Sequence, residues 1–142
     1  MTIDPTSLLS ANAGVQVLAS SLLGIGMLIP MQPRAARLRP KLQMRALLSA
    51  HLDWLMLAFM QWGAVITMTQ WPATRSQIVA VLLVCGGWAN ALPYLFRAFR
   101  VDAFVFGGGW LQRTAALLGA VSSAAIVVAW AMICMRVVGG AA

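Results

Sequence analysis

The sequence predicts an all-α integral membrane protein, a bundle of four membrane-spanning helices. Of its 142 residues, 61% are hydrophobic and 9% are charged, and the mean hydropathy is +0.85, whereas a soluble domain usually carries about 25% charged residues. A spanning helix takes roughly 20 mainly apolar residues. The chain therefore has room for about four such helices with short connections, and we expect a single transmembrane domain over residues 1–142.

Hydropathy places the four spans at about residues 8–31, 46–69, 77–97 and 114–137. The first apolar run is too long for the core of a signal peptide, so we expect it to be retained as a span. The first connection, residues 32–45, is strongly basic and contains Arg34, Arg37, Arg39, Lys41 and Arg45. Basic loops of membrane proteins stay on the cytoplasmic side. Four crossings then put the third connection on that side as well, with both termini outside.

The net charge of +7 indicates orientation in the membrane. The chain lacks the polar surface on which a nucleic-acid groove is built, so the expected partner is the lipid bilayer and not a nucleic acid. Cys85 and Cys134 fall in apolar stretches without CxxC spacing. The absence of this spacing argues against a disulfide framework and against a thiolate metal site.

The second span carries two ionisable residues, His51 and Asp53, and His51 is the only histidine of the chain. Ionisable groups within the hydrocarbon region are costly unless they find partners, so each is a functional candidate. His51 shares a helix face with Trp54, whereas Asp53 is rotated away by about 200°. The two side chains therefore cannot pair, and a buried Asp53 needs a partner on another helix or at a subunit interface. An arginine near the same membrane face, such as Arg45 or Arg97, could serve.

The third span carries a polar stripe, because Gly86, Asn90 and Tyr94 are spaced by four and lie along one helix face. Pro93 removes one backbone donor and collides with the preceding turn, which predicts a kink beside Asn90. A kink next to an amide and a phenol is typical of a pocket wall.

Depth along the helices places His51, Asn90 and Tyr94 in one layer of the membrane. At about 1.5 Å per residue, all three lie within about 12 Å of the face where the second span begins and the third ends. A cavity there, lined by Trp54 and Trp88, would suit a small apolar or aromatic substrate with one polar atom.

The chemistry open to these residues is limited. Without a nucleophile elbow, hydrolysis by a Ser–His–Asp triad is not expected, and one histidine does not build a structural zinc site. A neutral imidazole can, however, be the single axial ligand of haem iron and leave the opposite position open. Two structural interpretations also remain open: interhelical hydrogen bonding for His51 and Asn90, and an interfacial aromatic role for Tyr94. Ala115, Gly119 and Ser123 form a small-residue stripe that predicts helix packing.

The segment GGWANALPYLFRAF, together with SAHL in the preceding span, resembles the styrene oxide isomerase family of small four-span bacterial membrane proteins. The resemblance covers about residues 46–110. It includes a histidine near the start of the second span and an Asn and a Tyr four residues apart in the third. The matching residues of the third span are Gly87, Trp88, Ala89, Asn90, Tyr94, Leu95 and Phe96.

The resemblance implies a homotrimer in the bacterial inner membrane that holds haem b between neighbouring subunits, with His51 as the axial ligand. Ferric iron would act as a Lewis acid on the oxygen of a small aryl epoxide, and a hydride shift would deliver an aldehyde (a Meinwald rearrangement). Asn90 and Tyr94 would orient the oxygen and support its developing charge. Trp54, Gly86 and Trp88 would line the substrate pocket.

One residue departs from the family pattern, because Gly86 stands where the family has Asp. The stretch SAHLD and Gly86 also resemble the hydroxylaminobenzene mutases, membrane isomerases that move a hydroxyl from nitrogen to an aromatic ring. A mutase-type isomerase is therefore the alternative function. Two further alternatives are a small four-helix transporter, in which Asp53 would carry the proton coupling, and a haem-binding subunit without catalysis.

Overall fold

The computed structural model describes residues 3–140, and this part of the chain is helical, with no strand. The α-helices are α1 (Pro5–Leu28), α2 (Met44–Gln70), α3 (Gln77–Asn90), α4 (Leu92–Ala98) and α5 (Trp110–Gly139). Three short 3-10 helices lie in the connections, η1 (Ile29–Met31), η2 (Pro33–Lys41) and η3 (Pro72–Thr74).

Four helical segments are long and apolar enough to cross a membrane, which confirms the predicted number. They are Pro5–Met31, Met44–Gln70, Gln77–Ala98 and Trp110–Gly139. α3 and α4 together make the third of them. The protein is therefore a membrane protein of the four-helix class.

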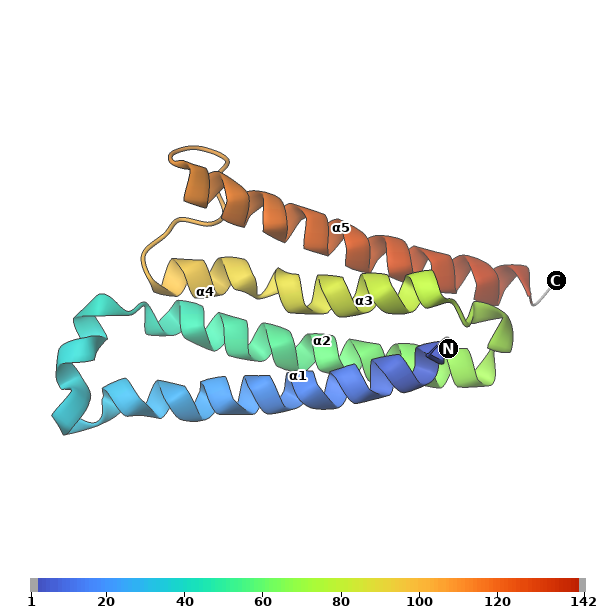
Figure 1. Ribbon diagram of the computed structural model, residues 1–142, viewed down its shortest axis with the longest axis horizontal. Helices are drawn as coiled ribbons and strands as arrows, with labels where there is room; N and C mark the ends of the chain where they lie inside the picture. Colours follow the sequence, from blue (N-terminus) through green and yellow to red (C-terminus); the bar gives the residue numbers. More distant parts are fainter. Residues whose placement is uncertain (1–2, 141–142) are drawn as a thin grey trace.

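The helices lie side by side, with α1 against α2, and with α3 and α4 between α2 and α5 (Figure 1). The start of α1 and the end of α5 lie at the same end of the bundle, beside η3. The opposite end holds η1, η2 and the loop between α4 and α5, so the first and third connections share one end as predicted. Most of the basic side chains are there: Arg34, Arg37, Arg39, Lys41, Arg45, Arg97, Arg100 and Arg113.

Local signals in the sequence explain where α1 begins. Asp4 caps the helix, since its carboxylate accepts hydrogen bonds from the Thr6 hydroxyl and, at 2.9 Å, from the Ser7 backbone N–H. These hydrogen bonds hold the pKa of the exposed Asp4 carboxyl below its usual value. Pro5 follows at the first helical position, where its missing N–H has no intrahelical acceptor.

The third span breaks beside Asn90, as the kink prediction requires. α3 ends at Asn90, Ala91 forms a turn, and α4 begins at Leu92. Pro93 has no N–H to continue the helical pattern, and the Tyr94 N–H donates to the Ala91 carbonyl at 3.1 Å. The break sets Asn90 and Tyr94 on either side of a turn.

Small residues bring α5 close to the third span. A Cβ at Gly86 would lie 2.8 Å from Ile126 Cγ1 and 3.1 Å from the Ser122 carbonyl oxygen. A Cβ at Gly119 would lie 2.9 Å from Pro93 Cγ. The small-residue stripe of α5 thus packs against the third span, as predicted, because only small residues let two backbones approach so closely.

A buried polar network that the sequence reasoning missed joins α1, α2 and α3. Gln61 Nε2 donates to Gln16 Oε1, and Gln16 Nε2 donates to the Gly87 carbonyl, at 2.7 Å and 2.8 Å. Asn12 Nδ2 donates to Gln61 Oε1 at 2.7 Å. The signal was in the sequence, since Asn12, Gln16 and Ser20 recur every four residues on one face of α1.

We expect Gly119→Ala to destabilise the bundle, because its Cβ would press on the ring of Pro93. Overpacking of this kind costs about 1–3 kcal/mol, so the thermal unfolding midpoint of the detergent-purified protein should fall. Gly14→Ala is the matched control, since no atom lies within 4 Å of the added Cβ. Equal midpoints for the two variants would contradict the close contact.

Candidate active site

His51 lies between α2 and α1, where α1 holds one of its ring nitrogens. Nδ1 lies 2.7 Å from the Ser20 carbonyl oxygen and 3.0 Å from Ser20 Oγ. A carbonyl oxygen only accepts, so Nδ1 carries the proton. The Ser20 hydroxyl in turn donates to the His51 carbonyl at 2.7 Å. Ser20 therefore fixes both the ring and its tautomer.

The ring of His51 rests on the backbone of Gly24, one turn further along α1. A Cβ at Gly24 would lie 3.0 Å from Cε1, 3.3 Å from Nδ1 and 3.6 Å from Nε2 of the imidazole. Because Nδ1 is protonated, Nε2 carries the free lone pair, and no hydrogen bond within residues 3–140 uses it. Nε2 is the nitrogen available to a metal.

A single histidine nitrogen fits a metal whose other ligands come from a cofactor. Within residues 3–140 no group of three or more His, Cys, Asp or Glu side chains could hold a bare ion. Haem iron needs only one or two protein ligands. A ligating histidine usually donates its other N–H to a carbonyl or carboxylate, as His51 does to Ser20.

Asn90 is held from two sides, by α2 and by α5. Its Nδ2 donates to the Asp53 carboxylate, at 2.9 Å to Oδ2 and 3.2 Å to Oδ1. Its Oδ1 accepts from Ser123 Oγ at 2.9 Å. Ser122 Oγ lies 3.3 Å from the same oxygen, but its one proton is nearer to the Gly119 carbonyl, at 2.9 Å. A carboxylate only accepts, so Asp53 fixes which way the amide points. Asn90 can still offer a ligand the second N–H of its amide.

The partner of Asp53 differs from the one expected. The sequence reasoning placed it on another helix, which is correct, but named Arg45 or Arg97, whereas the partner is the amide of Asn90. The rotation of about 200° between residues 51 and 53 explains the arrangement. Since Asp53 points to α3, His51 points to α1.

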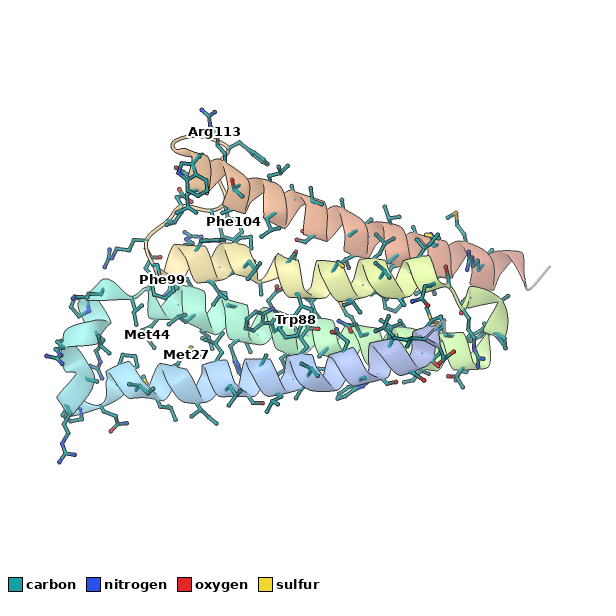
Figure 2. The ribbon with its side chains drawn as sticks, viewed as in Figure 1. Met27, Met44, Trp88, Phe99, Phe104 and Arg113 are labelled. Carbon is teal, nitrogen blue, oxygen red and sulfur yellow. The ribbon has the colours of Figure 1, made fainter. Side chains whose placement is uncertain are left out.

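Asn90 and Tyr94 line one cavity of about 270 Å³ between the third span and α5. Its apolar wall is formed by Pro93, Ala103, Phe104, Phe106, Ala116, Gly119 and Ala120. Phe104, labelled in Figure 2, lies in the loop that leads to α5, and its ring centroid is 5.0 Å from that of Tyr94. The cavity is therefore lined by an amide side chain, a phenol side chain and an aromatic wall.

The other candidate residues lie outside this cavity. His51, Trp54, Gly86 and Trp88 are not among its lining residues. Trp54 and Trp88 form an edge-to-face pair, 5.4 Å between centroids (Trp88 in Figure 2), and the Trp88 indole donates to Asn12 Oδ1 at 2.9 Å. The structure thus brings Asn90 and Tyr94 together and keeps His51 at a separate place in the same chain.

The residues that the sequence reasoning missed hold the candidates in place. Ser20 and Gly24 position His51, and both continue the four-residue spacing of Asn12 and Gln16 along one face of α1. Ser123 was interpreted as packing alone, but its hydroxyl bonds to Asn90. Phe104 belongs to a loop without periodicity, so no sequence pattern could place it beside Tyr94.

The fold and these residues define a four-span membrane protein with a single histidine donor and a small aromatic cavity beside an amide and a phenol. The family model for styrene oxide isomerase matches residues 6–138, nearly the whole chain, and the protein belongs to this family. The comparisons with curated proteins and with solved structures found no match. Family membership indicates an isomerase of the styrene oxide isomerase type.

We expect Asp53→Leu to destabilise the protein more than Asp53→Asn. The leucine variant leaves the half-buried Asn90 Nδ2 without its acceptor, and an unsatisfied polar group costs up to about 1–3 kcal/mol when it is fully buried. Asparagine still presents an oxygen to that N–H. Thermal unfolding of the two variants in one detergent measures the difference, and equal midpoints would show that the hydrogen bond contributes nothing.

Proposed function

We propose that the protein converts a small aryl epoxide to an aldehyde, with haem b bound through His51. Membership of the styrene oxide isomerase family supports the reaction class. The observation that carries the haem proposal is the contact between His51 Nδ1 and the Ser20 carbonyl at 2.7 Å. It leaves Nε2 without a proton, so that this nitrogen could hold the iron of a bound haem.

Bound haem would supply a ferric Lewis acid to polarise the epoxide oxygen. His51 would hold the iron, and Ser20 would hold His51. Because Ser20 and Gly24 fix the imidazole on α1, the ligand would be oriented before the cofactor arrives, which lowers the cost of binding.

Asn90 and Tyr94 would act on the substrate oxygen from their own cavity. Opening of the benzylic C–O bond places negative charge on oxygen, and the free N–H of Asn90 and the Tyr94 hydroxyl are donors that can stabilise it. Asp53 and Ser123 prevent the amide from turning its oxygen toward that charge. Phe104 and Pro93 would exclude water while positive charge develops at the benzylic carbon.

The complete site would require a second chain. In one chain His51 faces α1, whereas the cavity of Asn90 and Tyr94 lies on the side of α5. We therefore propose that haem lies between neighbouring chains of a homotrimer, with His51 from one chain and the cavity from the next. Single haems shared in this way would give a ratio of one haem to one chain.

We expect His51→Ala to abolish haem binding. The test is the absorption spectrum of detergent-purified protein produced with sufficient haem, wild type beside variant, with the iron content measured on the same samples. The wild type should show a Soret band and His51→Ala should not. Ser20→Ala is a useful companion, because the carbonyl that accepts from Nδ1 remains and the band should persist. A Soret band retained in His51→Ala would refute the ligand assignment.

We expect Tyr94→Phe and Asn90→Ala to keep the Soret band and lose turnover. Loss of one donor to a developing oxyanion lowers kcat by about 10²–10³-fold. The assay follows the aldehyde formed from styrene oxide, with an aryl hydroxylamine as the second substrate, since the mutase alternative predicts activity on that compound. Unchanged kcat in both variants would exclude these residues from the reaction.

A further inference from the structure

A second cavity lies at the basic end of the bundle, between the start of α2 and the end of α4. It has a volume of about 140 Å³ and is lined by Gln43, Arg45, Ala46, Ser49, Tyr94 and Arg97. The Gln43 backbone N–H donates to the Ala98 carbonyl at 2.9 Å and ties the two helix ends together. The cavity therefore has a fixed frame.

The charged side chains of this cavity are both positive. Arg45 comes from α2 and Arg97 from α4, and no acidic residue lines the cavity. Asp102 lies in an adjoining cavity with Arg97 and Arg100, but in the part of the chain that the structure describes no arginine donates a hydrogen bond to it. Two guanidinium groups of like charge on one small cavity repel each other unless an anion lies between them.

The donors around this cavity match the oxygens of one kind of anion. A guanidinium offers paired N–H groups that fit a phosphate or carboxylate, and the Gln43 amide adds a neutral donor. The position of the cavity decides between the two anions. α2 begins at Met44 and α4 ends at Ala98, so the cavity lies where a spanning helix meets the headgroup layer, and phosphates fill that layer.

We propose that Arg45 and Arg97 form a binding site for a phosphate group, supplied in the membrane by an anionic phospholipid. The site adjoins the candidate active site through Tyr94, which lines both cavities. Arg97 also lies over the ring of Phe104, 5.5 Å from its centroid, and Phe104 packs on Tyr94. An anion that holds Arg97 therefore supports the aromatic wall of the neighbouring cavity.

The test compares ligands and variants by their effect on thermal unfolding of the full chain in a neutral detergent. The probes are phosphatidylglycerol, phosphatidylcholine and inorganic phosphate, each titrated separately. Phosphatidylglycerol should raise the unfolding midpoint more than phosphatidylcholine. A matching rise with inorganic phosphate alone would show that the free ion suffices, and a rise with the anionic lipid alone would identify the headgroup as the source.

The decisive variant is Arg45→Gln with Arg97→Gln. We expect its apparent affinity for phosphatidylglycerol to fall about a hundredfold, about tenfold for each guanidinium group that no longer donates to the phosphate. The matched control, Arg34→Gln with Arg37→Gln, removes the same charge from exposed positions of η2 at the same end. The control should weaken binding by at most about thirtyfold, less than the site variant does.

Arg45→Gln alone keeps the contact of Arg97 with Phe104, so it tests the site if the double variant unfolds. It should weaken binding about tenfold. Equal reductions of affinity in the site and control variants would overturn the proposal and show that the basic end attracts lipid only by its overall charge. The proposal also fails if no probe shifts the wild-type midpoint more than phosphatidylcholine does.

Discussion

The arrangement of α2 depends on a requirement that the bilayer imposes: a polar side chain within the hydrocarbon layer must find its partner inside the protein. His51 and Asp53 are two residues apart and point in nearly opposite directions. One side of α2 must therefore meet an acceptor for an imidazole N–H, and the other must meet a donor for a carboxylate. Ser20 on α1 provides the acceptor, and Asn90 on α3 provides the donor. These two contacts place α2 between α1 and the third span.

The same requirement explains how function and packing share residues. Asp53 and Ser123 hold the Asn90 amide in one orientation and leave its second N–H for a ligand. Gly24 gives His51 a flat backbone surface, and Gly119 lets Pro93 and the cavity wall approach α5. Rigid support of this kind is what a site needs if a hydrogen bond is to act on a developing charge without rearrangement.

The number of spans, the break beside Asn90 and the family could be predicted from the sequence, because hydropathy, proline chemistry and the segment around Asn90 and Tyr94 are local signals. The single pocket containing His51, Asn90 and Tyr94 was inferred from depth alone, and depth says nothing about rotation around the helix axis. The angle between His51 and Asp53 indicates that the two side chains face different neighbours. It assigns His51 to α1 only once Asn90 is known to be the partner of Asp53. The pairing of Tyr94 with Phe104 depends on an irregular loop and had no periodic signal.

The buried amides between α1, α2 and α3 also have a consequence for how the chain enters the membrane. Gln16 and Gln61 are almost wholly enclosed and bond to each other, to Asn12 and to the Gly87 carbonyl. An isolated α1 in lipid would leave these amides without a partner on another helix. The free-energy cost of the unpaired amides falls when α2 packs against α1, and falls further when α3 provides the Gly87 carbonyl. Association of α1 with α2 and α3 is thus favoured by side chains that lipid cannot solvate.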